Sequence, residues 1–202
     1  SMAEQVTFAD TSVNVSQATQ ESFKDVDIAI LAIPAEAVSK YAEMALKENC
    51  QIIDASGSLL DEKSPLVLYS INLDDADNAK KVIVTPNPLA QQLASVLAPL
   101  SQSIDIKRVV TSTYQAVSGK GKDAVAELFE QSASLLGGNE HLEVSNFSTQ
   151  IGFNCIPATS NFVGEHTSEE IQCSTQTQIL LRKQFPITVS AVQVPTFIGY
   201  AQ

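Results

Sequence analysis

Basic residues are scarce in this sequence. It has 12 Lys and Arg residues against 23 Asp and Glu residues, which gives a formal net charge of -11 over 202 residues. A surface this acidic repels the phosphates of nucleic acids and the headgroups of anionic lipids. We therefore expect neither nucleic acid nor a membrane surface as a partner.

Long hydrophobic runs are also missing. No tract of 18 or more apolar residues occurs, so no membrane span is predicted. Residues 1–10 are polar and lack the apolar segment of a signal peptide, so none is expected there. Because 44% of the residues are hydrophobic and only 17% charged, the chain can bury a core, and disorder is disfavoured.

Cysteine and histidine are sparse. The odd, unpaired set of Cys50, Cys155 and Cys173 is typical of a reducing compartment, so we expect a cytoplasmic protein. The spacing of Cys155, His166 and Cys173 fits no zinc pattern, and we expect no metal site. Apolar neighbours predict that Cys50 and Cys155 are buried and unreactive. His166 lies in a polar loop signal, and His141 follows a turn signal that predicts a solvated side chain.

Strand and helix patterns alternate in the first half. The apolar run 28–33 ends at Pro34 and predicts a strand buried on both faces, as in a parallel sheet. Further strands are predicted at 51–54 and 82–85. Residues 35–48 predict a helix with an apolar face, formed by Val38, Tyr41, Ala42, Ala45 and Leu46. This alternation predicts a parallel α/β sheet with right-handed crossovers.

A second helix is expected to begin at Asn87 and Pro88, because Asn is a good N-cap and Pro is tolerated at the first helical position. Pro99 predicts a kink or a stop near its end. Its expected apolar stripe consists of Leu89, Leu93, Val96, Leu97 and Leu100.

The second half has a different pattern. Residues 106–115 are rich in Val and Thr and predict a longer strand. Residues 122–136 predict an amphipathic helix with Val125, Leu128, Phe129, Leu135 and Leu136 as its apolar residues. A helix over 168–183 and a β-rich end over 187–200 complete the chain. We place a domain boundary near residue 100.

Several stretches, in order, resemble the aspartate-semialdehyde dehydrogenase family. Residues 111–121 (Thr-Ser-Thr-Tyr-Gln-Ala-Val-Ser-Gly-Lys-Gly) are similar to its Thr-Tyr-Gln-Ala-Val-Ser-Gly-Ala-Gly signature. Residues 150–157 (Gln-Ile-Gly-Phe-Asn-Cys-Ile-Pro) are similar to its Gln-Ile-Ala-Phe-Asn-x-Ile-Pro segment, and residues 65–67 and 71–72 match a third region. The pattern resembles the Usg-like branch, whose members lack the catalytic cysteine.

The resemblance implies a fold and a reaction. The family has a Rossmann-type parallel sheet followed by an α+β dimerisation domain with a mixed sheet. Residues 1–100 would then be a partial nucleotide-binding domain without its Gly-rich first strand, turn and helix, and residues 101–202 the dimerisation domain, which lacks the C-terminal helix. The family reduces aspartyl phosphate with NADPH through a thioacyl cysteine and a histidine acid/base.

The catalytic positions of the family are mostly replaced. Residues 85–90 (Thr-Pro-Asn-Pro-Leu-Ala) correspond to Asn-Pro-Asn-Cys-Ser-Thr, so Pro88 stands at the nucleophile. Gln193 corresponds to the arginine that grips the substrate carboxylate, and Tyr200 to the histidine. A charged guanidinium group is thus replaced by a neutral amide, and an imidazole is replaced by a phenol that does not titrate near neutrality. Gln115 survives.

The binding positions change too. The resemblance assigns an arginine to Leu60 and a lysine to Gln172, whereas Glu169 is kept. Pro34-Ala35 replaces a Gly-rich turn of the nucleotide site. Ser118 and Gly119 match the cofactor-contacting turn, although Ser-Gly is also ordinary turn chemistry.

Three hypotheses remain open. The chain is an inactive homologue that serves as a homodimeric scaffold or as a regulatory partner of another protein. It is a nucleotide-binding protein, with NADP as the family's cofactor, that carries out no turnover. Or it is an active NADP-dependent aspartate-semialdehyde dehydrogenase of amino-acid biosynthesis. Fold alone does not decide among them.

Overall fold

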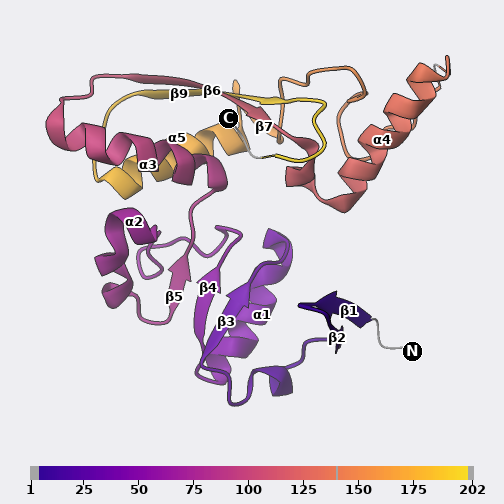
Figure 1. Cartoon of the computed structure of the whole chain (residues 1–202). Helices are drawn as coiled ribbons and strands as arrows, with labels where there is room; N and C mark the ends of the chain where they lie inside the picture. The colour runs from indigo at the N-terminus through magenta and orange to yellow at the C-terminus, as the bar shows by residue number, and fades with distance from the viewer. Residues whose placement is uncertain (1–4, 140, 200–202) are drawn as a thin grey trace. The chain divides into compact units, whose positions relative to one another are not determined.

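The computed structural model describes residues 5–139 and 141–199, and for Asn78 the backbone only (Figure 1). The chain forms two compact units. Residues 1–67 and 73–85 make up the first, and residues 68–72 and 86–202 make up the second. The second unit therefore takes over the chain from residue 86 onward, whereas the sequence predicts a boundary near residue 100.

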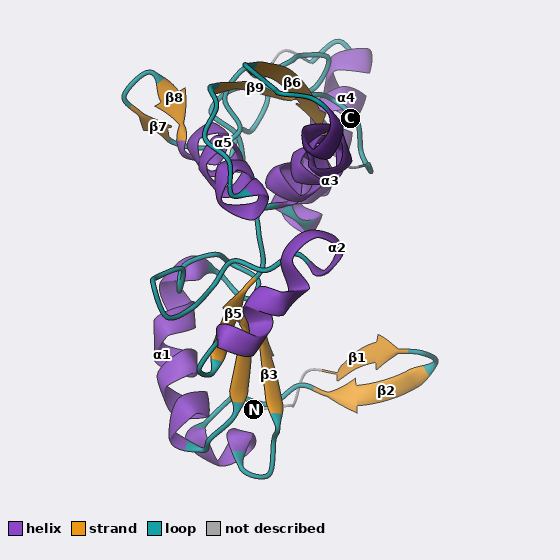
Figure 2. Ribbon diagram, turned by 90° about the vertical axis from the view of Figure 1, so that its left-hand side faces the viewer, coloured by secondary structure: helices purple, strands orange, loops and turns teal. Residues whose placement is uncertain are grey.

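The first unit holds a parallel sheet. Strands β3 (Ile28–Leu31), β4 (Gln51–Asp54) and β5 (Val82–Val84) pair in the order β3-β4-β5 (Figure 1). Figure 2 shows the sheet in a view turned by 90°. Helix α1 (Ala35–Lys47) connects β3 to β4. The predicted strands, the helix and the parallel pairing are confirmed.

The core of this unit lies between α1 and one face of the sheet. Val38 and Ala42 of the helix pack in one buried cluster with Ala29, Leu31 and Ile52 of the strands. The other face of β3 is open, since the side chains of Ile28 and Ile30 are 53% and 68% exposed. The prediction that this strand is buried on both faces was wrong, because α1 covers only the face with Ala29 and Leu31.

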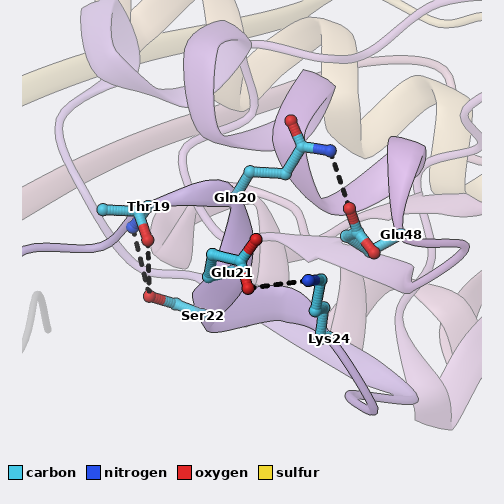
Figure 3. A network of polar contacts seen from close by, with 6 residues as sticks. All are labelled: Thr19, Gln20, Glu21, Ser22, Lys24 and Glu48. Carbon is cyan, nitrogen blue, oxygen red and sulfur yellow. Dashed lines mark hydrogen bonds and ion pairs between the residues drawn. The ribbon is translucent and has the colours of Figure 1, made fainter.

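A hairpin and a short helix precede the sheet. Strands β1 (Gln5–Phe8) and β2 (Thr11–Asn14) pair antiparallel, and all their residues are exposed. The 3-10 helix η1 (Gln20–Phe23) follows; Figure 3 shows its polar contacts. The Gln20 side-chain amide donates to Glu48 at 2.7 Å, which joins η1 to the end of α1. A second 3-10 helix, η2 (Leu73–Asn78), precedes β5.

The second unit is built on a pair of long strands. Strands β6 (Val109–Gln115) and β9 (Ile187–Gln193) are parallel over their whole length, and an antiparallel bridge joins Ile156 to Gln193. Parallel and antiparallel pairing on β9 confirms the expected mixed sheet.

Two helices cover one face of these strands. They are α3 (Pro88–Ser103) and α5 (Ser168–Leu181), and Figure 1 shows them beneath β6 and β9. Leu89 of α3, Cys173 of α5 and Val189 of β9 form one buried cluster. The short α2 (Tyr69–Asn72) belongs to the same unit.

A second core forms around α4 (Lys122–Leu136), the predicted helix. The 3-10 helix η3 (Val117–Lys120) leads into it. Val117, Ala124, Leu128, Ile151 and Ile156 are its buried cluster. Phe129 and Leu136, expected on the apolar face, are 63% and 79% exposed. A small hairpin of β7 (Phe162–Val163) and β8 (His166–Thr167) precedes α5.

Helix α3 departs from its prediction in two ways. It does not stop at Pro99 but continues to Ser103, because Leu97 and Ser101 on either side of the proline are both buried. Its expected stripe is only partly right, since Val96 and Leu100 are 61% and 46% exposed. Small residues make up much of the buried face: Leu89, Ala90, Ala94, Leu97 and Ser101.

The cysteines and histidines lie in different surroundings. Cys50 and Cys173 are buried, but Cys155 is exposed, so its predicted burial was wrong. Cys155 lies in an irregular segment between the buried Ile151 and Ile156, where Phe153 is also 66% exposed. His141 is exposed as predicted, whereas His166 lies in β8 and not in a loop. No helix in the described part of the chain has the length and hydrophobicity to cross a membrane.

Candidate functional site

Two adjoining cavities of the second unit contain most of the residues that the resemblance singles out. The Pro88 cavity, of about 330 Å³, is lined by Pro88, Gln115, Ser118, Gly119 and Glu169, among others. The Lys120 cavity, of about 230 Å³, is lined by Gln115, Lys120, Thr159, Glu169, Gln172 and Gln193, among others. Gln115, Gly119 and Glu169 border both, so the two cavities lie side by side.

The N-terminus of α3 carries Pro88, the residue that the resemblance assigned to the nucleophile position. Asn87 is the predicted N-cap, and its side-chain oxygen accepts from the backbone N–H of Leu89 at 2.8 Å. Pro88 is the first helical residue. A thiolate here would be stabilised by the helix dipole and by backbone N–H groups, but proline offers neither a nucleophile nor an N–H.

Gln115 and Glu169 face each other across the region. Gln115 is the last residue of β6, and its side-chain amide donates to the Glu169 carboxylate at 3.1 Å. Glu169 lies in the first turn of α5, where a negative charge is favoured by the helix dipole. The retained pair therefore presents one carboxylate whose second oxygen is left for another donor.

A capping box fixes the start of α5. Burial opposes ionisation of Glu170, yet hydrogen bonds from the backbone N–H groups of Thr167 and Ala191 lower its pKa below the ordinary value. The Thr167 N–H lies 2.7 Å and the Ala191 N–H 2.9 Å from this carboxylate. Because Ala191 belongs to β9, Glu170 holds the helix that carries Glu169 and Gln172 in a set register on the sheet.

Gln193 is the residue that the resemblance assigned to the family's arginine. Its side chain is only 2% exposed, and its amide donates to the backbone oxygen of Gln115 at 2.7 Å. The side chain thus joins the ends of β6 and β9. It adds no positive charge to the cavity.

Two residues that line the Lys120 cavity were not predicted from the sequence. The Lys120 ammonium donates to the backbone oxygen of Thr159 at 3.0 Å and lies 5.8 Å from the centre of the Phe147 ring. Thr159 is 6% exposed, and within the described residues its hydroxyl has no hydrogen-bond partner. Lys120 could have been noticed in the sequence, since it stands where the family signature has alanine. No feature of the sequence pointed to Thr159.

Of the two remaining predicted positions, one belongs to the first unit and the other lies outside the described residues. Leu60 is half-buried in the first unit, in the loop after β4. The buried Asp54 carboxylate holds this loop by accepting from Ser56 and Leu59 backbone N–H groups at 2.8 and 2.9 Å. Tyr200 lies outside the described residues.

The nucleotide-site residues make a poor phosphate cradle. Helix α1 begins after Pro34, which provides no side-chain cap and no N–H for a phosphate. Ser118 has its own structural contacts, since its hydroxyl donates to the Gly199 oxygen at 3.3 Å and its N–H donates to the Phe197 oxygen at 3.2 Å. These residues do not by themselves fit a dinucleotide. Among the residues placed in the structure, no three His, Cys, Asp or Glu side chains converge as metal ligands.

The chain matches two family models over almost its whole length. Residues 2–79 match the NAD binding domain of semialdehyde dehydrogenase, and residues 97–202 match its dimerisation domain. Aspartate-semialdehyde dehydrogenase of Rickettsia bellii is 34% identical over 205 residues, which cover all of this chain and 60% of that protein. A USG-1 protein homolog of Pseudomonas aeruginosa is 31% identical, covering 98% of this chain and 60% of the relative.

Solved structures agree with these matches. Aspartate semialdehyde dehydrogenase II of Vibrio cholerae, in a complex with ASA, superposes with a TM-score of 0.90 at 30% identity, covering 96% of this chain and 59% of that one. The chain therefore spans about 60% of the length of the relatives it matches. The predicted fold class, a parallel Rossmann-type sheet followed by a dimerisation domain, is confirmed. The chain belongs to the semialdehyde dehydrogenase family.

Proposed function

We propose that this protein is a catalytically inactive aspartate-semialdehyde dehydrogenase homologue, which acts as a cytoplasmic dimeric scaffold or regulatory protein. The observation that carries the proposal is Pro88, which begins α3 and lines the Pro88 cavity where the family has its cysteine. Thioacyl chemistry needs a side chain that attacks a carbonyl and then leaves, and proline has none.

The described cysteines do not take over this role. Cys173 is buried, and burial with the nearby Glu169 charge raises its pKa to about 11, so it stays a thiol at neutral pH. Cys155 is exposed but lines neither cavity. An activated nucleophile also needs a neighbouring base, and the described histidines, His141 and His166, do not border either cavity.

Loss of the cationic side chains that bind the substrate in the family supports the same proposal. The arginine and lysine positions within the second unit are Gln193 and Gln172, which are uncharged. The third cation position is Leu60. Each hydrogen bond to a charged group is worth about 1.5–3 kcal/mol, so a dianionic acyl phosphate loses most of its binding energy here.

The dimer part of the proposal rests on an uncovered sheet face. Helices α3 and α5 cover one face of β6 and β9, and on the other face Val110 and Tyr114 are 63% and 54% exposed. The match of residues 97–202 to a dimerisation domain indicates a homodimer by family. A second copy on this face would bury apolar surface that monomers seldom leave in contact with water.

Nucleotide binding without turnover is the second candidate. The match of residues 2–79 to the NAD binding domain favours it, and NADP is the family cofactor that we would test first. Calorimetric titration of the full-length protein with NADP separates the candidates, because a scaffold without a nucleotide site gives no heat of binding. The primary proposal is tested by assaying phosphate-dependent NADP reduction with aspartate semialdehyde. Turnover there would instead support the active enzyme.

A further inference from the structure

A third of the basic residues of this acidic chain lie at one end of the second unit. Residues 101–110 and 180–186 contain one acidic residue, Asp105, and four exposed basic residues, which we call the arginine patch: Lys107, Arg108, Arg182 and Lys183. The two arginines are the only ones in the sequence. Together with Asp105 the patch has a net charge of +3, which leaves -14 for the rest of the chain.

The fold brings these two segments together from distant parts of the sequence. The first connects α3 to β6 and the second connects α5 to β9, so both lie at the same end of the unit (Figure 1). The backbone N–H of Val109 donates to the oxygen of Pro186 at 2.9 Å, and the Lys183 ammonium donates to the backbone oxygen of Ser101. None of the patch residues lines the Pro88 cavity or the Lys120 cavity.

Structural roles account for only part of the arginine patch. Arg182 and Lys183 follow the last turn of α5, and Lys183 also contacts the last turn of α3, where the helix dipole favours cations. Lys107 and Arg108 precede β6 and belong to no helix. Lys107 pairs with Asp105, but their side chains are 82% and 79% exposed, and such a pair stabilises a fold little. Within the described residues, the Arg108 side chain has no ion pair or hydrogen bond.

The contrast between the local and the total charge decides which partner fits. At physiological ionic strength, charges more than about 8 Å apart are largely screened, so a short anionic segment on the patch meets mainly the local positive charge. A longer polyanion such as nucleic acid, or an extended anionic membrane, also meets the acidic remainder of the chain and is repelled. The planar guanidinium group of arginine matches a carboxylate, to which it can donate two parallel hydrogen bonds.

We propose that the arginine patch docks a short, carboxylate-rich segment of a partner protein. Arg108 and Arg182 each bind a carboxylate, and Lys107 adds positive charge beside them. Ile104, which is 57% exposed at the end of α3, offers an apolar contact to a neighbouring side chain of the segment. This interaction goes beyond the proposed loss of turnover, because the patch lies apart from both cavities, and it gives the proposed regulatory protein a surface for its partner.

Fluorescence anisotropy on the full-length protein tests the proposal with three labelled probes. They are a short peptide of Glu and Leu residues, the same peptide with Gln in place of every Glu, and a longer single-stranded oligonucleotide. We expect the Glu peptide to bind, and the Gln peptide and the oligonucleotide to bind more weakly or not at all. Affinity for the Glu peptide should fall as the salt concentration rises from about 0.15 M to about 1 M, because the Debye length shortens from about 8 Å to about 3 Å.

Paired variants separate the patch from the total charge. Arg108→Gln combined with Arg182→Gln should weaken binding of the Glu peptide about tenfold, and Arg108→Lys combined with Arg182→Lys should lose only part of it. Lys80→Gln combined with Lys122→Gln is the matched control, since it removes the same charge from two exposed lysines outside the patch and should leave the affinity unchanged. The melting temperatures of all variants should stay close to the native value, because these side chains are exposed.

The proposal is overturned if the Glu peptide does not bind at millimolar concentration, if the oligonucleotide binds more tightly, or if the arginine pair and the lysine pair of Gln variants behave alike. The NADP reduction assay is separate from these measurements. Catalytic activity together with peptide binding, or neither of the two, therefore shows which of the two proposals has failed.

Discussion

The backbone N–H of Asn87 donates to the side-chain oxygen of Gln176 at 2.6 Å, which ties the start of α3 to the middle of α5. Gln176 is 6% exposed. This bond therefore holds the helix that presents Pro88 next to the helix that presents Glu169.

Gln176→Ala should lower the free energy of unfolding by about 1 kcal/mol, because it leaves the N–H of the partly buried helix cap Asn87 without its partner. Urea denaturation of the full-length protein measures the change. Gln92→Ala is the control, since Gln92 is an exposed residue of α3, and it should change stability by less than about 0.5 kcal/mol. Equal effects for the two variants would show that the Asn87 contact contributes nothing.

Cysteine reactivity follows directly from burial. Of the three cysteines, only Cys155 is exposed, so one thiol per chain should react quickly with a disulfide reagent at pH 8 and all three in denaturant. Cys173 should be slow, since burial raises its pKa to about 11. Cys155→Ser should abolish the fast phase. A fast phase that persists in this variant would contradict the burial of Cys50 and Cys173.

The dimer can be tested on the open face of β6. Tyr114→Lys places a charge where Tyr114 is 54% exposed, and light scattering at micromolar protein should show a shift from dimer to monomer. Tyr69→Lys, at an 81% exposed residue of α2, makes the same change elsewhere and should stay dimeric. A native protein that is monomeric at this concentration would exclude the dimer altogether.

Pro88→Cys alone should not create dehydrogenase activity. The new thiol would begin α3 and gain from the helix dipole, so it should react with a thiol reagent. The resemblance assigns the acid/base position to Tyr200, whose phenol would accept no proton near pH 7, and under the proposal the cationic substrate-binding residues stay absent. Steady-state assay of the variant beside Pro88→Ala checks this, and a rate well above that of Pro88→Ala would mean that another residue serves as the base.

The elements with strong periodic or capping signals were predictable from the sequence. Helix α4 and strand β4 have the predicted bounds, and Asn87 caps α3 as expected, because local hydrogen bonding and local packing decide these features. The β1–β2 hairpin was not predicted, because its residues are all exposed and follow no burial pattern. Cys155 lies in an irregular segment with no periodic burial pattern, so its apolar neighbours in sequence did not reveal its exposure.

The candidate site was predictable only in part. Pro88, Gln115 and Glu169 are far apart in sequence, and only the resemblance indicated that they converge; the structure brings them to one cavity. Thr159 was not predicted as a residue of the site, because no sequence motif marks it. Its place beside Lys120 depends on the folded chain, in which its backbone oxygen accepts from the Lys120 ammonium. The exposed face of β3 likewise depends on which elements cover the sheet, and the apolar run 28–33 carries no information about that.

The most direct test of the central claim is phosphate-dependent NADP reduction by the purified full-length native protein with aspartate semialdehyde, with Pro88→Ala measured in parallel. We predict no turnover above a trace that is the same in both preparations, because a group of residues that act together has been replaced and any one loss already costs orders of magnitude. A rate within tenfold of a typical enzyme value, about 10 per second, would contradict the claim that this family member is inactive.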